Sequence, residues 1–342
     1  MKVLGPLSGG EPASAGTGTF FPCVPHPARV ALEEGAASVL RTSAGLKAGE
    51  KVLVVADPER MSVGRAFFYA AAALGCDPVL ALIRTREGAG REPPDVLAAA
   101  TLESDVVLLA TVHSMTHTHA RRAANRSGAR VVSMPGITEE MLDGGALAVD
   151  HTQIHAQMRR LQRRLRGASR IHLATAAGTD VTLSARGREW NFSDTGVATR
   201  KGEFTTLPAG EIFVSPLEGS AEGRLVADAF FHEPLHAPAT AILEKGHAAR
   251  VVGAEAAILE MNRGGKEGRN LAKLGIGLNP KARATAALPE AEKALGAVHV
   301  AFGDSLPFGG KVSCGVRVDA ILTEATVEVD GKALVEKGKL TA

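Results

Sequence analysis

The sequence predicts a two-domain protein in which a doubly wound parallel-sheet α/β domain precedes an α+β domain. Three observations support this. A chain of 342 residues is long for one hydrophobic core. Apolar strands alternate with helical segments over about residues 35–150, which is typical of a parallel sheet. From Ile171 onward the apolar residues instead recur at every second position, which indicates sheets with one polar face.

The first domain, with its linking helix, is assigned to residues 27–167, after an extension over residues 1–26 that we expect to be flexible. Its elements follow in chain order: a strand at 51–56, a helix at 62–75, and strands at 77–83 and 105–111, then a helix at 116–128 and a strand at 129–136. No G-x-G-x-x-G follows either early strand, which argues against a dinucleotide site. Ser114, Thr116 and Thr118 suit capping of the second helix or, less commonly, anion binding there.

An amphipathic helix is expected at residues 152–167, and the α+β domain with the ligand cleft at 168–342. The helix has an apolar stripe of Ile154, Met158, Leu161 and Leu165. The second domain should contain strands of a mixed sheet at 171–175, 181–187, 211–216, 224–231, 298–303 and 316–330, with one or two helices over 251–263 and 264–275.

Composition excludes several functional classes. A net charge of +2 disfavours a general nucleic-acid binder, and the five arginines of helix 152–167 are more typical of a solvated face. No apolar run approaches the roughly 20 residues of a membrane-spanning helix. Three scattered cysteines and no signal-peptide pattern lead us to expect a cytoplasmic protein without a membrane partner.

Glu211, His299 and Asp319 are the strongest candidates for a functional site. Each lies in an apolar, strand-like context, where an ionisable side chain is usually paired or bound to a metal. Glycine-rich turns accompany all three. Together at the ends of consecutive strands, they predict a shared site.

Several segments resemble the aminopeptidase T family of metallopeptidases, whose superfamily includes iron-dependent dihydroxypyridine ring-opening dioxygenases. They are PAGEIFVSP, LGIGLNP, ALGAVHVAFGD and the V-D that follows PFGG, with LKAGEKVLVVAD, MPGITEEML and a GTD turn upstream. The resemblance covers nearly the whole chain after about residue 30. It implies the fold described above, a two-metal peptidase site and a homo-oligomer.

By this resemblance, Glu211, His299 and Asp319 match three of six metal-ligand positions. The other three positions hold Lys273 in place of Glu, Leu306 in place of Tyr, and Arg317 in place of His. A dication and an ammonium about 5 Å apart repel by roughly 7 kcal/mol at an effective dielectric near 20. Structural zinc binds with roughly 10–16 kcal/mol, so two cations and fewer ligands remove much of that margin. We therefore expect the two-metal peptidase centre to be absent.

Three interpretations remain open. We favour a metal-free cleft that binds a peptide-like or amino-acid-like ligand: Arg317 and Lys273 hold its carboxylate, Glu211 or Asp319 takes its amine, and His299 lies beside them. The alternative is an enzyme with one divalent metal (Zn, Mn or Fe) on Glu211, His299 and Asp319, a hydrolase first and a dioxygenase second. The third interpretation is metal-free catalysis by Lys273 as base or nucleophile, with Glu211.

Weaker candidates are two histidine groups and one cysteine. His113, His117 and His119 follow a strand closely and are more typical of a surface cluster than of a metal site. His232 and His236 have helical ligand spacing, but the proline between them argues against a helix. Cys314 could act as a nucleophile near His299, although no partner motif accompanies it.

Overall fold

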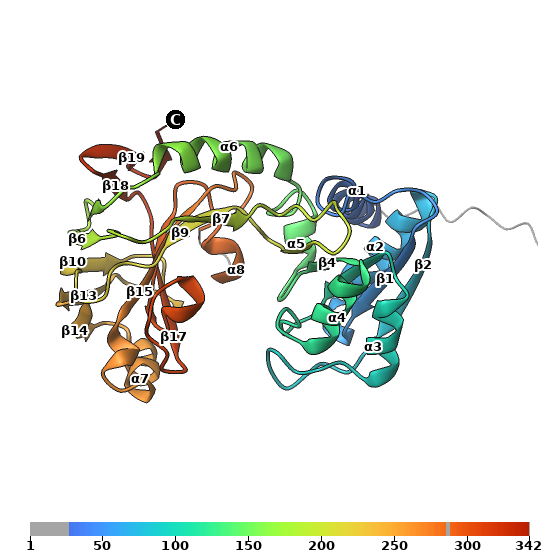
Figure 1. Cartoon of the computed structure of the whole chain (residues 1–342), viewed down its shortest axis with the longest axis horizontal. Coiled ribbons are helices and arrows are strands. Elements are labelled where there is room, and N and C mark those ends of the chain that lie inside the picture. Colours follow the sequence, from blue (N-terminus) through green and yellow to red (C-terminus); the bar gives the residue numbers. More distant parts are fainter. Residues whose placement is uncertain (1–26, 285–287, 342) are drawn as a thin grey trace, which may run out of the picture.

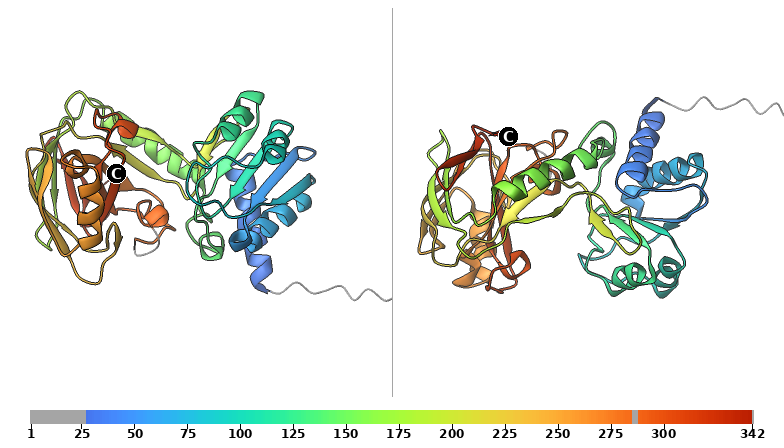
Figure 2. Two further views of the ribbon diagram at one scale, coloured as in Figure 1. Left: turned by 90° about the horizontal axis from the view of Figure 1, so that it is seen from below. Right: turned by 45° about the horizontal axis from the view of Figure 1, so that its top comes forward.

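The computed structural model describes residues 27–284 and 288–341, which form two lobes (Figure 1). The expected flexible extension at residues 1–26 lies outside the described residues. Helix α6, His151–Arg164, carries the chain from the first lobe to the second and runs along the second lobe (Figure 2). The fold class is confirmed: the first lobe has a parallel sheet covered by helices, and the second is built on antiparallel sheets.

The first lobe contains a five-stranded parallel sheet in the order β2-β1-β3-β4-β8. Its strands are β1 Lys51–Ala56, β2 Asp77–Leu82, β3 Val106–Ala110, β4 Arg130–Ser133 and β8 Phe204–Thr206. Its helices are α1 Pro27–Thr42, α2 Met61–Ala73, α3 Asp95–Leu102, α4 His119–Ser127 and α5 Glu139–Leu142, with a 3-10 turn at Pro58–Arg60. β1 and β3 are nearly continuous apolar runs, and β4 (RVVS) is buried along its whole length, because both faces of a parallel sheet are covered.

The fifth strand, β8, comes from a segment that the sequence assigns to the second domain. Val131 pairs with Phe204, and Ser133 with Thr206, in parallel register. The chain thus leaves the first lobe through α6, forms β5 to β7 in the second, and returns to complete the first sheet. This return brings Phe204, Thr205 and Thr206 to the side of the first lobe that faces the second.

The second lobe is a sandwich of two antiparallel sheets, whereas the sequence suggested one mixed sheet. The eight-stranded sheet has the order β14-β13-β10-β6-β5-β18-β19-β20 and the seven-stranded sheet has the order β12-β11-β17-β16-β15-β9-β7. The first comprises β5 Arg170–Ala174, β6 Asp180–Ser184, β10 Glu222–Ala227, β13 Ala239–Glu244, β14 His247–Val252, β18 Thr326–Val329, β19 Lys332–Glu336 and β20 Lys339–Leu340. The second comprises β7 Asn191–Asp194, β9 Glu211–Val214, β11 Phe230–Phe231, β12 Glu233–Pro234, β15 Leu271–Gly277, β16 Val298–Gly303 and β17 Arg317–Leu322.

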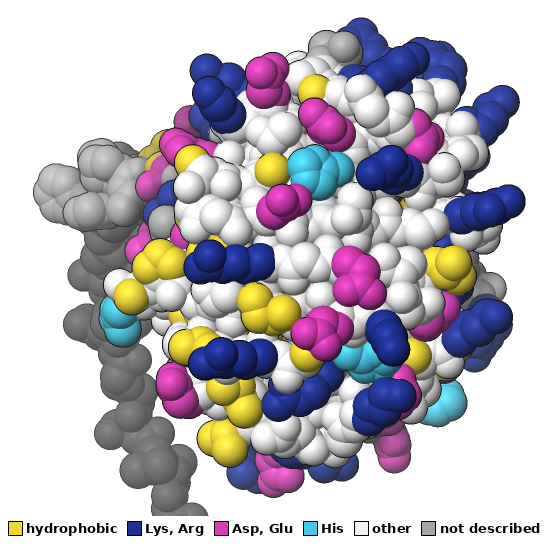
Figure 3. Space-filling view, turned by 90° about the vertical axis from the view of Figure 1, so that its left-hand side faces the viewer, with side chains coloured by type: hydrophobic (Ala, Val, Ile, Leu, Met, Phe, Trp, Pro, Cys, Tyr) yellow, Lys and Arg dark blue, Asp and Glu magenta, His cyan; other side chains and the backbone are white. Residues whose placement is uncertain are grey.

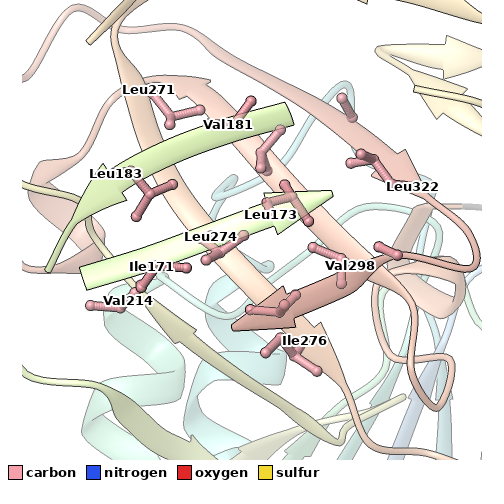
Figure 4. Close-up of a cluster of buried hydrophobic side chains, with 14 of the residues drawn as sticks. Ile171, Leu173, Val181, Leu183, Val214, Leu271, Leu274, Ile276, Val298 and Leu322 are labelled. Atoms are coloured by element: carbon pink, nitrogen blue, oxygen red, sulfur yellow. The ribbon is translucent and has the colours of Figure 1, made fainter. Parts of the chain in front are cut away.

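The core of this lobe lies between the two sheets. Figure 4 shows Ile171, Leu173, Val181 and Leu183 from β5 and β6 over side chains of the seven-stranded sheet. The facing side chains include Val214, Leu274, Ile276 and Val298, all buried. Side chains alternate across a strand, so the residues between these apolar positions point to the outer face of the seven-stranded sheet.

Two elements expected from the sequence are corrected. The helix at residues 264–275 is wrong: the structure has a 3-10 turn at Glu267–Arg269 followed by strand β15. The long strand at 316–330 is two strands, β17 and β18, which belong to different sheets. Helix α7, Glu255–Arg263, agrees with the expected helix at 251–263 except at its start. Short helix α8, Leu288–Ala291, and a 3-10 turn at Leu306–Phe308 complete the lobe.

The outer surface of the second lobe carries charges of both signs. Figure 3 shows Lys and Arg side chains interspersed with Asp, Glu and His rather than one large basic patch. The arginines at 159, 160, 163, 164 and 166 are exposed, and Arg164 donates hydrogen bonds to the carbonyl oxygens of Thr341 and Ala333. Among the described residues, no helix is long and apolar enough to cross a membrane.

Met158 of α6 tests how strongly this helix is attached to the second lobe. Its side chain is 0% exposed and belongs to the sandwich core, whereas the adjacent Arg159 is exposed. Met158→Ala should lower the free energy of unfolding by about 2–5 kcal/mol because a cavity replaces the side chain. Arg159→Ala should change it by less than about 0.5 kcal/mol. Equal urea midpoints for the two variants would contradict this packing.

Candidate functional site

The candidate site lies on the outer face of the seven-stranded sheet. In its ladders Asp194 stands opposite Glu211, Gly275 opposite His299, and Ala301 opposite both Lys273 and Asp319. Opposite residues of an antiparallel pair point to the same face. One face thus collects polar side chains from β7, β9, β15, β16 and β17, while the other face supplies the core.

The carboxylate of Glu211 is the centre of this group. Its Oε1 is 3.0 Å from the Lys273 ammonium nitrogen Nζ and its Oε2 is 2.8 Å from it. Nζ of Lys293 is 2.7 Å from Oε1, and Nε2 of His299 is 2.8 Å from Oε2. The side chain of Glu211 is 7% exposed and that of Lys273 is 2% exposed, so this is a buried ion network.

Two further carboxylates lie around Lys293. Its Nζ is 3.1 Å from Oδ2 of Asp194 and 3.4 Å from Oε1 of Glu292. Oδ2 of Asp194 also accepts hydrogen bonds from the backbone N–H groups of Gly210 and Glu211. These contacts hold Asp194 at the edge of the network, where it lines a cavity.

Arg317 and Asp319 form an ion pair along β17. Two positions apart on one strand, they share a face, and the guanidinium reaches Oδ1 of Asp319 at 2.7 Å and 3.0 Å. A longer contact of 3.2 Å joins Arg317 to Oε2 of Glu292. Asp319 is therefore neutralised by its own neighbour rather than by Lys273.

His299 is buried beneath the network because its strand neighbour has no side chain. A Cβ on Gly275 would lie 2.1 Å from Cε1 and Nε2 of the imidazole, so only glycine leaves room for the ring. Neither ring nitrogen of His299 makes a hydrogen bond among the described residues, although Nε2 lies 2.8 Å from Oε2 of Glu211. Burial and the Lys273 ammonium lower the pKa of His299, which favours a neutral imidazole.

The ammonium of Lys273 is covered by two aromatic rings. Its Nζ lies 4.8 Å from the ring centroid of Phe213 and 5.3 Å from that of Phe308, within the range of cation–π attraction. The two rings meet edge to face, with their centroids 5.7 Å apart. Lys273 is not among the cavity-lining residues, so the sequence-based role for it as a ligand contact or catalytic base gains no support from its position.

A cavity of about 730 Å³ adjoins the network. The first lobe contributes Thr116, His117 and all three residues of β8, and the second lobe contributes the rest. The lining residues are Thr116, His117, Ser193, Asp194, Phe204, Thr205, Thr206, Glu211, Phe213, Lys293, Asp304, Pro307, Phe308 and Arg317. Of the strongest sequence candidates, Glu211 and Arg317 reach this cavity, and so do Thr116 and His117 from the weaker ones.

Charge and burial oppose each other in this network. Burial alone would raise the pKa of Glu211, but the ammonium groups of Lys273 and Lys293 hold it well below its usual range. Burial would likewise raise the pKa of Glu292, but the charges of Lys293, Lys273 and Arg317 together outweigh it, so the value falls to about 2. Asp194 differs, since burial and the nearby Glu211 raise its pKa despite Lys293.

The residues do not fit the metal centre that the family resemblance implies. Donor atoms of Glu211, Glu292 and His299 lie within 4.8 Å of one another, a group that could hold an ion by composition. However, both oxygens of Glu211 already contact Lys273, whose Nζ is also 3.7 Å from Oε2 of Glu292. The third ligand expected from the sequence, Asp319, is paired with Arg317. A dication here would have an ammonium as its immediate neighbour.

The weaker sequence candidates stay apart from this network. Thr118 caps α4 by accepting from the N–H of Arg121, and Glu92 occupies the anion position by accepting from the N–H groups of His119 and Ala120. His232 and His236 lie around the β11–β12 hairpin, not on a helix. Burial raises the pKa of the Cys314 thiol, which disfavours a nucleophilic thiolate.

Sequence analysis missed Asp194, Glu292 and Lys293. The segment PEAEKALG resembles an ordinary polar helical turn, and α8 is indeed a short helix that ends just before Glu292. Asp194 lies in NFSD, which has no distinctive pattern. Glu292 and Lys293 could have been noticed as charged residues directly before the family-like segment ALGAVHVAFGD.

The network predicts a specific acid sensitivity. A carboxyl group whose pKa is lower in the folded state than in the unfolded state stabilises the fold at pH values above its unfolded pKa, near 4.5. This stabilisation is lost as the pH falls from the unfolded pKa to the folded pKa. For Glu292, with a folded pKa of about 2, the loss extends from about pH 4.5 to about pH 2. It should amount to about 2–4 kcal/mol in urea unfolding. Glu292→Gln should show a correspondingly smaller loss over this interval, and an unchanged pH dependence would contradict the assignment.

Comparisons with known proteins place this geometry in a family. The family model described as NicX, 2,5-dihydroxypyridine 5,6-dioxygenase, matches residues 34–342. The structure of 2,5-dihydroxypyridine dioxygenase from Pseudomonas putida KT2440 superposes with a TM-score of 0.72 at 20% identity, covering 92% of this chain and 98% of that one. Wild-type AmpT from Thermus thermophilus superposes with a TM-score of 0.63 at 19% identity, covering 92% of this chain and 100% of that one.

No curated protein matches the chain. The two structural similarities establish a shared fold, and the likeness to aminopeptidase T holds at that level. The family model extends over most of the sequence and includes every residue of the ion network. The chain therefore belongs to the NicX family of 2,5-dihydroxypyridine 5,6-dioxygenases.

Proposed function

We propose that this chain binds a small, planar, hydroxylated aromatic compound in the cavity between its lobes, the class of compound named by its family. The main support for this proposal is the lining of that cavity, which combines aromatic side chains with charges of both signs. Small-molecule sites are typically concave, apolar in their walls and polar at a few convergent points. A volume of about 730 Å³ accommodates a single-ring compound with water.

The aromatic part of the lining supports a flat ligand. Phe204 enters from β8 of the first lobe, and Phe213 and Phe308 enter from the second. Aromatic rings prefer offset or edge-to-face contacts with other rings, and such pairs are worth about 0.5–1.5 kcal/mol beyond area burial. An aliphatic peptide backbone makes no equivalent use of these walls.

The polar part suits a ring that both donates and accepts hydrogen bonds. The contacts described for Asp194 all use Oδ2, which leaves Oδ1 as the atom to accept from a hydroxyl or ring N–H. Its raised pKa suits a role in taking up or sharing that proton. Lys293 and Arg317 provide donors for an ionised ring oxygen.

A peptide-like or amino-acid-like ligand is the competing proposal, favoured by the sequence interpretation. It uses the same cations for a carboxylate and Asp194 or Glu211 for an amine. One observation weakens it: Lys273, which was expected to hold the carboxylate, lies outside the cavity wall. The homo-oligomer and cytoplasmic location remain proposals that rest on the resemblance and on cysteine usage.

Metal-dependent ring opening is the second candidate function. Family membership favours it, as does the group of Glu211, Glu292 and His299 with donor atoms within 4.8 Å. It requires the Lys273 ammonium to leave the Glu211 carboxylate, a contact that burial strengthens. Binding of an aromatic compound is common to both candidates, so the ligand and the metal are tested separately.

Calorimetric titration with 2,5-dihydroxypyridine should detect binding, and a simple dipeptide should bind more weakly. Phe308→Leu retains apolar volume but removes the ring, and should weaken binding about tenfold, equivalent to about 1.4 kcal/mol. Leu306→Ala serves as the control in the same 3-10 turn, since Leu306 is exposed and does not line the cavity. Tighter binding of the dipeptide would favour the competing proposal.

Oxygen consumption tests the second candidate. Protein incubated anaerobically with ferrous iron and then given 2,5-dihydroxypyridine in air should consume oxygen no faster than the buffer with iron, because Lys273 occupies the ligand group. Ring opening monitored by ultraviolet absorbance should likewise be at background. Stoichiometric oxygen uptake that His299→Ala abolishes would establish the metal-dependent function in place of metal-free binding.

A further inference from the structure

We infer that the ammonium groups of Lys273 and Lys293 take the place of the metal dication that the family resemblance implies for this site, so that the buried carboxylates are neutralised by the chain's own side chains. The inference does not depend on the identity of the ligand. It concerns what keeps the buried carboxylates together.

The first argument is position. Nζ of Lys273 lies 2.8 Å and 3.0 Å from the two oxygens of Glu211 and 3.7 Å from Oε2 of Glu292. The imidazole Nε2 of His299 contacts the same Glu211 oxygen at 2.8 Å. The ammonium thus approaches two of the three side chains whose donor atoms cluster within 4.8 Å.

The second argument is charge. Lys273 and Lys293 both contact Glu211, and together they bring the two positive charges that one dication would bring. The described ion network contains four carboxylates, from Asp194, Glu211, Glu292 and Asp319, and three cations, with Arg317 assigned to Asp319. With all seven groups ionised the net charge of this network is −1, so the two lysines and Arg317 already neutralise most of the buried negative charge without a metal ion.

The third argument is retention. Lys273 is fixed to strand β15, and its side chain is 2% exposed beneath the rings of Phe213 and Phe308. Ala301, opposite Lys273, leaves space for the long side chain on this face. A covalently attached ammonium cannot diffuse away, so a free metal ion has to compete with a permanently local cation.

Wild-type protein purified without chelator or added metal provides the first test. Elemental analysis should find less than about 0.1 ion of zinc, manganese or iron per chain, since the ligand carboxylates are occupied. Titration with cobalt should produce no d–d absorption band. About one ion per chain that His299→Ala removes would overturn the inference.

Reversal of the charge provides the second test. Lys273→Glu should bind about one zinc per chain, at least about 100-fold more tightly than wild type, because a repelling cation becomes a ligand. Lys201→Glu makes the same charge change on an exposed turn and should leave zinc affinity unchanged. Equal zinc uptake by Lys273→Glu and wild type would refute the inference.

Lys273→Met covers the case in which Lys273→Glu does not fold. It removes the charge at similar volume and leaves Glu211 with fewer counter-ions. Zinc should raise the melting temperature of this variant by several degrees and leave that of wild type unchanged. A variant that zinc does not stabilise would show that the ammonium is not a replacement for a metal.

Discussion

The contact of the Glu211 carboxylate with Lys273, Lys293 and His299 is the interaction on which the site depends. Removing one partner from a buried ion pair typically costs about 3–5 kcal/mol, because an uncompensated charge stays behind in a poorly solvated position. The partners come from β9, β15, β16 and the segment after α8. One carboxylate therefore holds β9 against segments that follow it much later in the chain, since Lys273 and Lys293 lie 62 and 82 residues beyond Glu211. The neighbouring Arg317–Asp319 pair repeats this arrangement within a single strand.

Strand geometry explains how one sheet supports both a dry core and this charged face. Leu274 and Ile276 point into the sandwich, whereas Lys273, just before them, points outward and Gly275, between them, faces the same outer side. Small residues on the outer face provide the necessary volume, since Gly275 accommodates the His299 ring and Ala301 stands opposite Lys273. A shift of register by one residue would place these charges in the core, so the apolar inner face also specifies the site.

Sequence patterns predicted the helices and strands whose buried residues recur regularly. They failed for segments whose secondary structure is determined by tertiary contacts. β1 and β3 are apolar runs, and α6 has a clear stripe, so each was recognisable. The segment LAKLG has a spacing compatible with a helix, but pairing with β9 and β16 makes it a strand. β8 has three residues, too few for a period, and exists because β4 offers a free edge.

The candidate site was predicted in the same uneven manner. Glu211, His299 and the two exchanged residues Lys273 and Arg317 were identified from family-like segments, and the structure brings the first three into contact. The partner of each charged residue was not predictable from the sequence. The sequence does not show that Lys273 contacts Glu211 or that Arg317 contacts Asp319. Glu292 and Lys293 lay outside any recognisable pattern because their role arises from where α8 ends, which is a tertiary property.

Family membership and site chemistry carry different information in this protein. The family model and the shared fold reflect strands, turns and core positions distributed over residues 34–342. Chemistry depends on a few side chains, and exchanging an ion for ammonium groups leaves the fold intact while changing what the site can do. A metal ion offers open coordination positions to a ligand, whereas the ammonium of Lys273, which does not line the cavity, directs its hydrogen bonds to Glu211. The groups that remain available to a ligand are those at the cavity wall, Asp194, Lys293 and Arg317 beside the phenylalanine rings. Recognition in this chain should therefore proceed through hydrogen bonds and aromatic contacts.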